Sequence, residues 1–359
     1  MERCESELQE VVAAIREVDE SARQQAVEHT SRLVMPPRAM GRLHHTGERL
    51  WAISGGSRPV LRERAVIVFA GDHGVVDEGV TDFPQAVSQE MIRCFLRDGA
   101  GINAMARTVD ADVFVVDMGT AAQSDEEDSA TGRFFSRKVG RGTDNLARGP
   151  AMSWEQAARS VQNGYQIAAE SIRGGVRLLG TGDMGIGNTT PSSAVGCVFT
   201  GHAVREMVGR GTGIDDERLR KKQEAVSSGL ELNGPDPEDG LDVLGKVGGF
   251  EIGGIAGCIL AAANYGIPVV LDGLISTAGA LVANRLAPAC RGYMFAGHVS
   301  EEPGHRYMLD YLGLDPLLDL GMRLGEGTGA ALAMKLIDAA AALSSEVMTF
   351  DQAGISLEG

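Results

Sequence analysis

The segment Ala65-Val-Ile-Val-Phe-Ala-Gly-Asp-His-Gly74 decides the fold class. Its first six residues form a continuous apolar run, which is typical of a strand that is covered on both faces of a parallel sheet. The run ends abruptly in glycine and polar residues, as expected where such a strand leaves the sheet at a ligand-binding edge. We therefore expect an α/β protein and look for further strands of this kind on either side.

The chain alternates between short apolar runs and helical periodicity. Further strands are expected at 113–117, 176–180, 267–271 and 292–296, and helices at 86–107, 154–172, 190–199, 215–232, 251–263 and 328–343. Residues 5–34 hold two helical stretches that precede every strand, and residues 120–150 are polar and without periodicity, which indicates a surface excursion. The alternation predicts a mostly parallel sheet with helices on both faces.

Composition excludes several classes of protein. The chain has 359 residues and a net charge of −16, so binding to nucleic acid or to an anionic membrane would need a local basic patch, and none is visible. The five cysteines are scattered without a CxxC pair, which fits a reducing compartment. The acidic N-terminus resembles no signal peptide, and the longest apolar stretch, 252–270, is interrupted by glycine, asparagine and proline. We expect a cytoplasmic protein.

Glycine is unusually frequent, with 48 residues, and it gathers at the predicted strand ends. These ends are 71–74, 180–190, 272–273 and 297–298. Glycine at a strand end lets backbone N–H groups turn toward an anion, although strand-to-helix turns need glycine in any case. The run 180–190 is a candidate phosphate cradle, but it is neither a P-loop nor a GxGxxG fingerprint. Lys222 on the helix after Gly211-Thr-Gly213 is a candidate phosphate ligand or a solvated surface lysine.

Gly325-Glu326-Gly327-Thr328 is a candidate catalytic motif. A carboxylate between two glycines, just before an apolar helix, can lie close to a ligand without interference from its neighbours. The helix N-terminus favours the charged form and burial opposes it, and this balance can set a general base near neutral pH. The same pattern also fits a glutamate that only complements the helix dipole.

Metal and nucleophile motifs are absent from the sequence. The seven histidines form no HExxH or HxH pattern, and there is no GxSxG elbow. We therefore expect neither a metal nor another cofactor. Asp72 and Asp272 could hold sugar hydroxyls or could simply cap strands.

Several motifs together resemble one family. They are Gly71-Asp-His-Gly-Val-Val-Asp-Glu-Gly-Val80, Phe83-Pro-Gln-Ala-Val87, Gly182-Asp-Met-Gly-Ile-Gly-Asn-Thr-Thr190, Gly209-Arg-Gly-Thr-Gly-Ile-Asp-Asp216, Gly248-Gly-Phe-Glu-Ile252, Asp272-Gly273 and Leu324-Gly-Glu-Gly-Thr-Gly-Ala-Ala-Leu332. In this order, from about residue 35 to the C-terminus, they resemble the nicotinate-nucleotide:5,6-dimethylbenzimidazole phosphoribosyltransferases, which make the lower-ligand nucleotide of cobalamin.

The resemblance implies a fold and a reaction. It implies a Rossmann-like α/β domain over 51–320 and a small helical domain built from 1–50 and 321–359, in a homodimer. The expected reaction converts nicotinate mononucleotide and 5,6-dimethylbenzimidazole into α-ribazole 5′-phosphate and nicotinate, with inversion at the anomeric carbon.

The resemblance also implies site residues. Glu326 matches the catalytic base, and Asp183, where many members have glutamate, is the second catalytic carboxylate. The glycine loop and Lys222 would bind the nucleotide, and Gln85 would lie beside the benzimidazole. The full set expected to contact substrate is Gln85, Met184, Gly185, Ile186, Gly187, Lys222, Asp272, Gly273, Gly297, His298 and Gly325.

The expected chemistry needs one base and no metal. Nicotinate leaves as a neutral pyridine, so little acid assistance is required, while the attacking benzimidazole must lose its N–H proton, which Glu326 could accept. Asp183 or Asp272 could stabilise the oxocarbenium-like sugar. Two alternatives remain open: the same donor with another acceptor, such as adenine or a phenol, or a nucleotide-binding protein without activity.

Overall fold

A six-stranded parallel sheet forms the centre of the molecule in the computed structural model, which describes residues 2–122 and 132–356. Its strand order is β3-β2-β1-β4-β5-β6, the order of a Rossmann fold. The strands are β1 (Arg64–Gly71), β2 (Ala111–Gly119), β3 (Phe134–Ser136), β4 (Leu178–Met184), β5 (Val269–Leu271) and β6 (Met294–Ala296). β7 (His298–Ser300) and β8 (Leu318–Met322) form a separate parallel pair. The predicted α/β class, with a mostly parallel sheet and helices on both faces, is confirmed.

Helices make up most of the remaining structure. They are α1 (Glu2–Ala14), α2 (Glu20–Thr30), α3 (Arg42–Ile53), α4 (Ala86–Leu96), α5 (Gly101–Thr108), α7 (Trp154–Arg173), α8 (Thr189–Thr200), α9 (Val204–Met207), α10 (Asp216–Asn233), α11 (Gly240–Val247), α12 (Phe250–Asn264), α13 (Leu274–Leu286), α14 (Pro303–Leu312) and α15 (Thr328–Glu346), with 3₁₀ turns η1 (Gly74–Glu78) and η2 (Pro288–Tyr293). None of the helices within the described residues is long and apolar enough to span a bilayer.

β1 supplies both hydrophobic cores, because successive side chains of a strand point to opposite faces. Ala65, Ile67 and Phe69 pack on one face into the core formed with α7, α12 and α13. Val66 and Val68 pack on the other face into the core formed with α4, α5 and α15. The continuous apolar run of the sequence is thus explained by a strand that is buried on both faces.

Part of the glycine excess serves helix packing. α7 and α12 cross so closely that a Cβ at Gly164 would lie 1.9 Å from the Gly254 carbonyl oxygen, and one at Gly257 would lie 1.9 Å from that of Val161. The sequence analysis assigned the glycines to turns and ligand contacts. This close contact between two helices is a further use that it did not predict.

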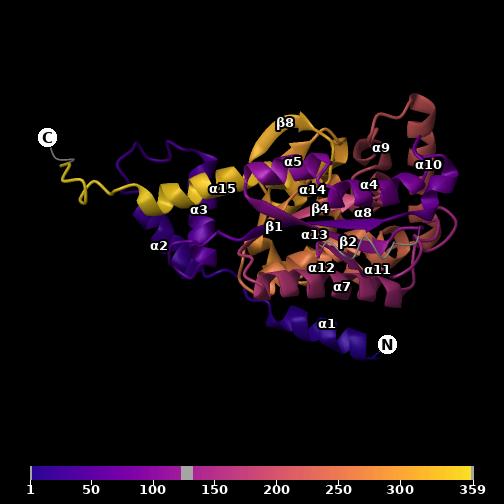
Figure 1. The fold of residues 1–359 in the computed structure, drawn as a ribbon, viewed down its shortest axis with the longest axis horizontal. Helices are drawn as coiled ribbons and strands as arrows, with labels where there is room; N and C mark the ends of the chain where they lie inside the picture. Colours follow the sequence, from indigo (N-terminus) through magenta and orange to yellow (C-terminus); the bar gives the residue numbers. More distant parts are fainter. Residues whose placement is uncertain (1, 123–131, 357–359) are drawn as a thin grey trace.

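The two ends of the chain meet beside the sheet. α15 contacts both α2 and α3, and Leu33 forms an isolated antiparallel bridge with Thr349. Figure 1 shows α2, α3 and the far end of α15 together at one end of the molecule, while α1 lies apart, against α7. The predicted division into residues 1–50, 51–320 and 321–359 stays a prediction.

Three predicted elements differ from the structure. The single helix expected at 86–107 is two helices, because Asp98 takes a positive φ of 58° and Asn103 caps a new start at Ala100. The excursion at 120–150 contains β3, which pairs with β2; its acidic cluster lies outside the described residues. The strand expected at 176–180 runs from Leu178 to Met184, so Gly182 and Asp183 are in a strand rather than a loop.

Candidate active site

The site lies where the order of the strands reverses. β1 and β4 are neighbours at the centre of the sheet, and the chain leaves their carboxyl ends through Gly71–Gly74 and Met184–Thr189. At such a point the connections on either side run away from each other and leave room for a ligand. Most of the residues expected to act on substrate gather at this edge.

Glu326 is buried, with 5% of its surface exposed, and its backbone has a φ of 64°. Its Oε2 accepts the backbone N–H of Ile102 at 3.0 Å. Burial raises the pKa of the Glu326 carboxyl and nearby Asp272 adds to this, while the amides of Ile102 and Gly101 oppose it. The result is a carboxylate in a fixed orientation with a raised pKa, as a general base requires.

The helix that holds the Glu326 carboxylate is not the one that the sequence suggested. Glu326 precedes α15, but its side chain reaches the N-terminus of α5, where Gly101 and Ile102 offer free N–H groups. The predicted balance of helix terminus against burial is present, but the helix terminus belongs to a distant segment.

Asp183 lies beside the loop that carries Glu326. A Cβ at Gly325 would be 3.1 Å from Asp183 Oδ2, and the same oxygen accepts the side-chain amide of Asn188 at 3.0 Å. Asp183 Oδ1 is buried and has no hydrogen-bond partner among the described residues. Burial raises the pKa of Asp183 well above its usual value, Asp272 adds to the shift, and the bond from Asn188 opposes it.

Asp272 caps α15. Its Oδ2 accepts the N–H of Gly327 at 3.0 Å, and its Oδ1 accepts that of Gly329 at 2.7 Å. The side chain is fully buried, and His298 Nε2 lies 3.4 Å from Oδ1. Burial alone would lower the pKa of His298, but the contact with Asp272 raises it. The capping role that we had left open is therefore present, on a helix rather than a strand.

Two glycines allow the backbone segments of the site to approach closely. A Cβ at Gly182 would lie 2.4 Å from the carbonyl oxygen of Glu326, and one at Gly185 would lie 2.1 Å from that of Gly71. Contacts this short with backbone atoms require glycine. Gly182 and Gly185 thus allow β4 and the turn after it to contact the Glu326 loop and the end of β1.

Lys222 is buried at a second part of the site. Its Nζ donates to Thr189 Oγ1 at 2.8 Å and to the Gly209 carbonyl at 2.9 Å, beside the N-terminus of α8. Burial lowers the pKa of Lys222 to about 8, and Glu302 opposes this shift. Glu302 also accepts the N–H of Gly211 at 2.6 Å. Lys222 is therefore not a solvated surface lysine.

The glycine loop connects the two parts of the site. Asn188 bonds Asp183 in the carboxylate group, and the next residue, Thr189, bonds the Lys222 ammonium. One turn of backbone at the start of α8 thus contacts both the acidic and the basic ends. A ligand with a reactive centre at one end and an anionic group at the other fits this arrangement.

The loop after β1 is held by buried polar contacts. Gln85 donates its side-chain amide to the His73 carbonyl at 2.9 Å, and His73 Nε2 lies 3.0 Å from Glu251 Oε1. Burial alone would lower the pKa of His73, but Glu251 raises it. The predicted contact of Gln85 with an acceptor stays a prediction.

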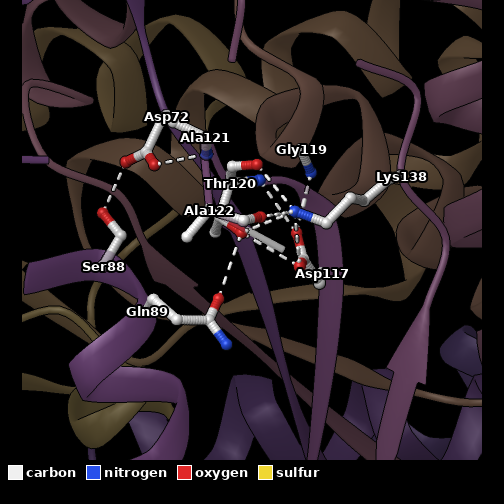
Figure 2. Close-up of polar contacts among 9 residues, drawn as sticks. All are labelled: Asp72, Ser88, Gln89, Asp117, Gly119, Thr120, Ala121, Ala122 and Lys138. Atoms are coloured by element: carbon white, nitrogen blue, oxygen red, sulfur yellow. Dashed lines mark hydrogen bonds and ion pairs between the residues drawn. The ribbon is translucent and has the colours of Figure 1, made fainter. Parts of the chain in front are cut away.

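Asp72 connects the ends of β1 and β2 (Figure 2). It accepts the hydroxyl of Ser88 and the N–H of Ala121, and it is 1% exposed. Beside it, Lys138 Nζ bonds the carbonyls of Thr120 and Ala122. Asp72 therefore organises loops, and its contact with a sugar stays a prediction.

The remaining predicted residues lie at the same edge. They are Met184 at the end of β4, Gly273 at the start of α13, Gly297 between β6 and β7, and Gly187 with a φ of 88°. Ile186 is also there, but its N–H donates to Ser88 Oγ at 3.2 Å. No three His, Cys, Asp or Glu side chains within residues 2–122 and 132–356 form a group that could hold a metal ion.

Several residues of the site were not predicted from the sequence. Asn188 and Thr189 were seen only as a helix start, although their polar side chains next to the glycine run were a usable signal. The amides of Gly101 and Ile102, Ser88 and Glu302 gave no such signal, because their roles depend on segments that meet only in the fold.

The chain is similar to known phosphoribosyltransferases. A family model described as a phosphoribosyltransferase matches residues 15–355. The nicotinate-nucleotide–dimethylbenzimidazole phosphoribosyltransferase of Desulforudis audaxviator is 49% identical over 97% of this chain and 98% of its own length. The enzyme of that name from Desulforamulus reducens is 51% identical over 97% and 99%. The crystal structure of CobT from Thermus thermophilus superposes with a TM-score of 0.89 at 45% identity, over 94% of this chain and 99% of that one.

Proposed function

The chain belongs to the nicotinate-nucleotide–dimethylbenzimidazole phosphoribosyltransferase family, and we propose that it performs this transfer with Glu326 as the general base. The donor is nicotinate mononucleotide and the acceptor is 5,6-dimethylbenzimidazole. The observation that carries the proposal is the buried Glu326 carboxylate, fixed by the N-terminus of α5.

The proton must leave the acceptor as it attacks. One benzimidazole nitrogen bonds to the anomeric carbon while the nicotinate nitrogen departs with the electrons of the broken bond, and the other benzimidazole N–H becomes acidic. Glu326 accepts that proton, and its raised pKa makes its carboxylate a stronger base than an exposed glutamate. Attack on the face opposite nicotinate inverts the anomeric configuration.

The cationic sugar lies next to Asp183 in this proposal. Asp183 Oδ1 is buried and has no hydrogen-bond partner in the part of the chain that the structure describes, so its charge is costly in the free enzyme. A positive charge that develops on the ribose offsets this cost and favours the ionised carboxylate. Asp183 therefore stabilises the transition state more than the ground state.

The 5′-phosphate binds at the other end of the glycine loop. Lys222 and the N-terminus of α8 supply positive charge there. The link between Asn188 and Thr189 supports this orientation, because it puts the phosphate group and the anomeric carbon at opposite ends of one loop. A homodimer and a cytoplasmic location complete the proposal.

The decisive experiment offers several acceptors to the purified protein with nicotinate mononucleotide. Products are identified by mass, and kcat/KM is compared for dimethylbenzimidazole, benzimidazole, adenine and p-cresol. We expect α-ribazole 5′-phosphate and nicotinate, with dimethylbenzimidazole preferred. A preference for adenine or p-cresol would reassign the acceptor but keep the donor chemistry, while binding of the donor without product would indicate a nucleotide-binding protein without activity.

A further inference from the structure

A buried chain of hydrogen bonds runs from the end of β2 to the glycine loop. The Ala121 N–H donates to Asp72 Oδ2 at 2.8 Å, the Ser88 hydroxyl donates to Asp72 Oδ1, and the Ile186 N–H donates to Ser88 Oγ at 3.2 Å. Asp72 and Ser88 are 1% and 0% exposed. The chain therefore joins three segments of the site, and its two side chains are shielded from solvent while its Ala121 end is partly buried.

The direction of each bond is fixed by the chemistry of the groups. The two backbone amides can only donate, and an ionised Asp72 can only accept. Ser88 must then give its proton to Asp72 and offer a lone pair to Ile186. A hydroxyl is the smallest group that can donate one hydrogen bond and accept another. Alanine at this position therefore leaves the Ile186 amide and one Asp72 oxygen buried without a hydrogen-bond partner from residue 88.

The far end of this chain is anchored. Lys138 Nζ bonds the carbonyls of Thr120 and Ala122, on either side of Ala121, and lies 3.0 Å from Asp117 Oδ2. Asp117 also accepts the N–H of Thr120 at 2.9 Å. Figure 2 shows this cluster beside the contact of Asp72 with Ser88. The Ala121 amide that supports Asp72 is thus held in place.

We propose that Ser88 is a positioning residue for donor binding, which acts by holding the glycine loop at Ile186 and is itself oriented by Asp72. The inference rests on the proposed function, because it takes the loop as the donor site. Ser88 is on α4 and contacts the loop through the Ile186 amide, so its effect should reach the donor through the position of this loop.

The test compares Ser88→Ala with Ser88→Thr and Ser160→Ala. Threonine keeps the hydroxyl, and Ser160 is an equally buried helical serine whose hydroxyl bonds the Ala157 carbonyl within α7. Calorimetric titration with nicotinate mononucleotide measures donor affinity directly. We expect Ser88→Ala to weaken the affinity for nicotinate mononucleotide by about five- to thirtyfold, while kcat and the acceptor KM change less than about twofold. Ser88→Thr should restore the donor affinity. Ser160→Ala should leave the donor affinity unchanged.

A double-mutant cycle tests whether Asp72 and Ser88 act through one chain. Asp72→Asn cannot accept from both donors, so it should also weaken donor binding, and the double variant should be no worse than the weaker-binding single variant. Unchanged donor affinity in a folded Ser88→Ala protein, or losses that simply add, would overturn the inference. If the wild type binds no nicotinate mononucleotide at all, the proposed function fails first.

Discussion

The carboxylate of Glu326 accepts the backbone N–H of Ile102 at 3.0 Å, across 224 positions of the sequence. This bond, together with the positive φ of Glu326, fixes the orientation of the side chain before any substrate is bound. Donors at a helix N-terminus also oppose the rise in pKa that burial causes. The carboxylate is thus held in one orientation, at the cost of a strained backbone.

Replacement of Glu326 by glutamine should stop proton transfer while the shape of the site is kept. The amide oxygen can still accept the Ile102 N–H, but it cannot take the acceptor proton. We expect kcat to fall by about 10²–10⁴ in steady-state assays, with donor affinity retained. The loss should shrink for an acceptor that enters already deprotonated. Turnover close to that of the wild type would move the base elsewhere, with Asp183 as the next candidate.

Lys222→Ala should impair donor binding, and Lys221→Ala is its matched control. Lys222 is buried against Thr189, whereas the adjacent Lys221 forms an exposed ion pair with Glu217. A lost charge-assisted hydrogen bond should raise the donor KM by about ten- to a hundredfold. Nicotinate riboside, which has no phosphate, should react equally poorly with wild type and Lys222→Ala. An equal effect of both lysine substitutions would show that Lys222 is no phosphate ligand.

The alkaline limb of the pH profile should report Lys222. Burial lowers the pKa of Lys222 to about 8, and only the protonated form carries the charge that attracts phosphate. Donor kcat/KM should therefore be highest below this value and fall as pH rises through it. This alkaline fall of donor kcat/KM should disappear in Lys222→Ala. If both proteins show the fall at the same pH, another group causes it.

Asp183→Asn should stabilise the fold while it lowers activity. Because the pKa of Asp183 is raised in the folded protein, the folded state binds its proton more tightly than the unfolded state does. Stability is therefore lost as pH rises from the unfolded pKa through the folded one. Asparagine carries no charge, so the Tm of the Asp183→Asn protein in calorimetry should exceed that of the wild type by a few degrees at about pH 8. The difference between the two proteins should vanish in acid. A lower Tm at this alkaline pH would contradict the raised pKa.

Gly182→Ala should displace the Glu326 loop. The new Cβ would lie 2.4 Å from the Glu326 carbonyl oxygen, and a backbone atom cannot move away alone. We expect kcat to fall at least about tenfold, by displacement of the base, and the free energy of unfolding to fall by about 1–3 kcal/mol. Gly149→Ala is the control, because its Cβ would meet nothing within 4 Å. Equal, small effects of both would show that the loop accommodates the methyl group.

The sequence was sufficient for five of the six strands of the sheet and for the edge at which the glycine-bearing strand ends gather. The buried strand β1 and the strand ends follow from apolar runs and the glycines that stop them, which are local signals. The expected strand at 176–180 ends too early, because the glycines from Gly182 onward indicate a loop. Pairing with β1 continues from Gly180 through Gly182 to Met184 and keeps this segment in a strand, and that pairing is a tertiary effect.

The supports of the catalytic groups could not be predicted in the same way. Glu326 was a candidate from its own neighbours and was matched to the base by the family resemblance, but the amide that binds it belongs to a helix whose separate start depends on Asp98 and Asn103. Ser88 likewise lies on a helix that gave only an apolar pattern. A residue whose role is to hold another segment shows this role only where the two segments meet.

The two-sided core has a consequence for biosynthesis. Val66 and Val68 of the early strand β1 pack against Met334 and Ile337 of α15, which is near the end of the chain. During translation, at about 5–20 residues per second, α4 and α5 can cover part of this face early, but the part that α15 covers stays exposed until nearly the whole chain has left the ribosome. A chain that stops before residue 326 therefore lacks both Glu326 and the cover that α15 gives to this face of the sheet.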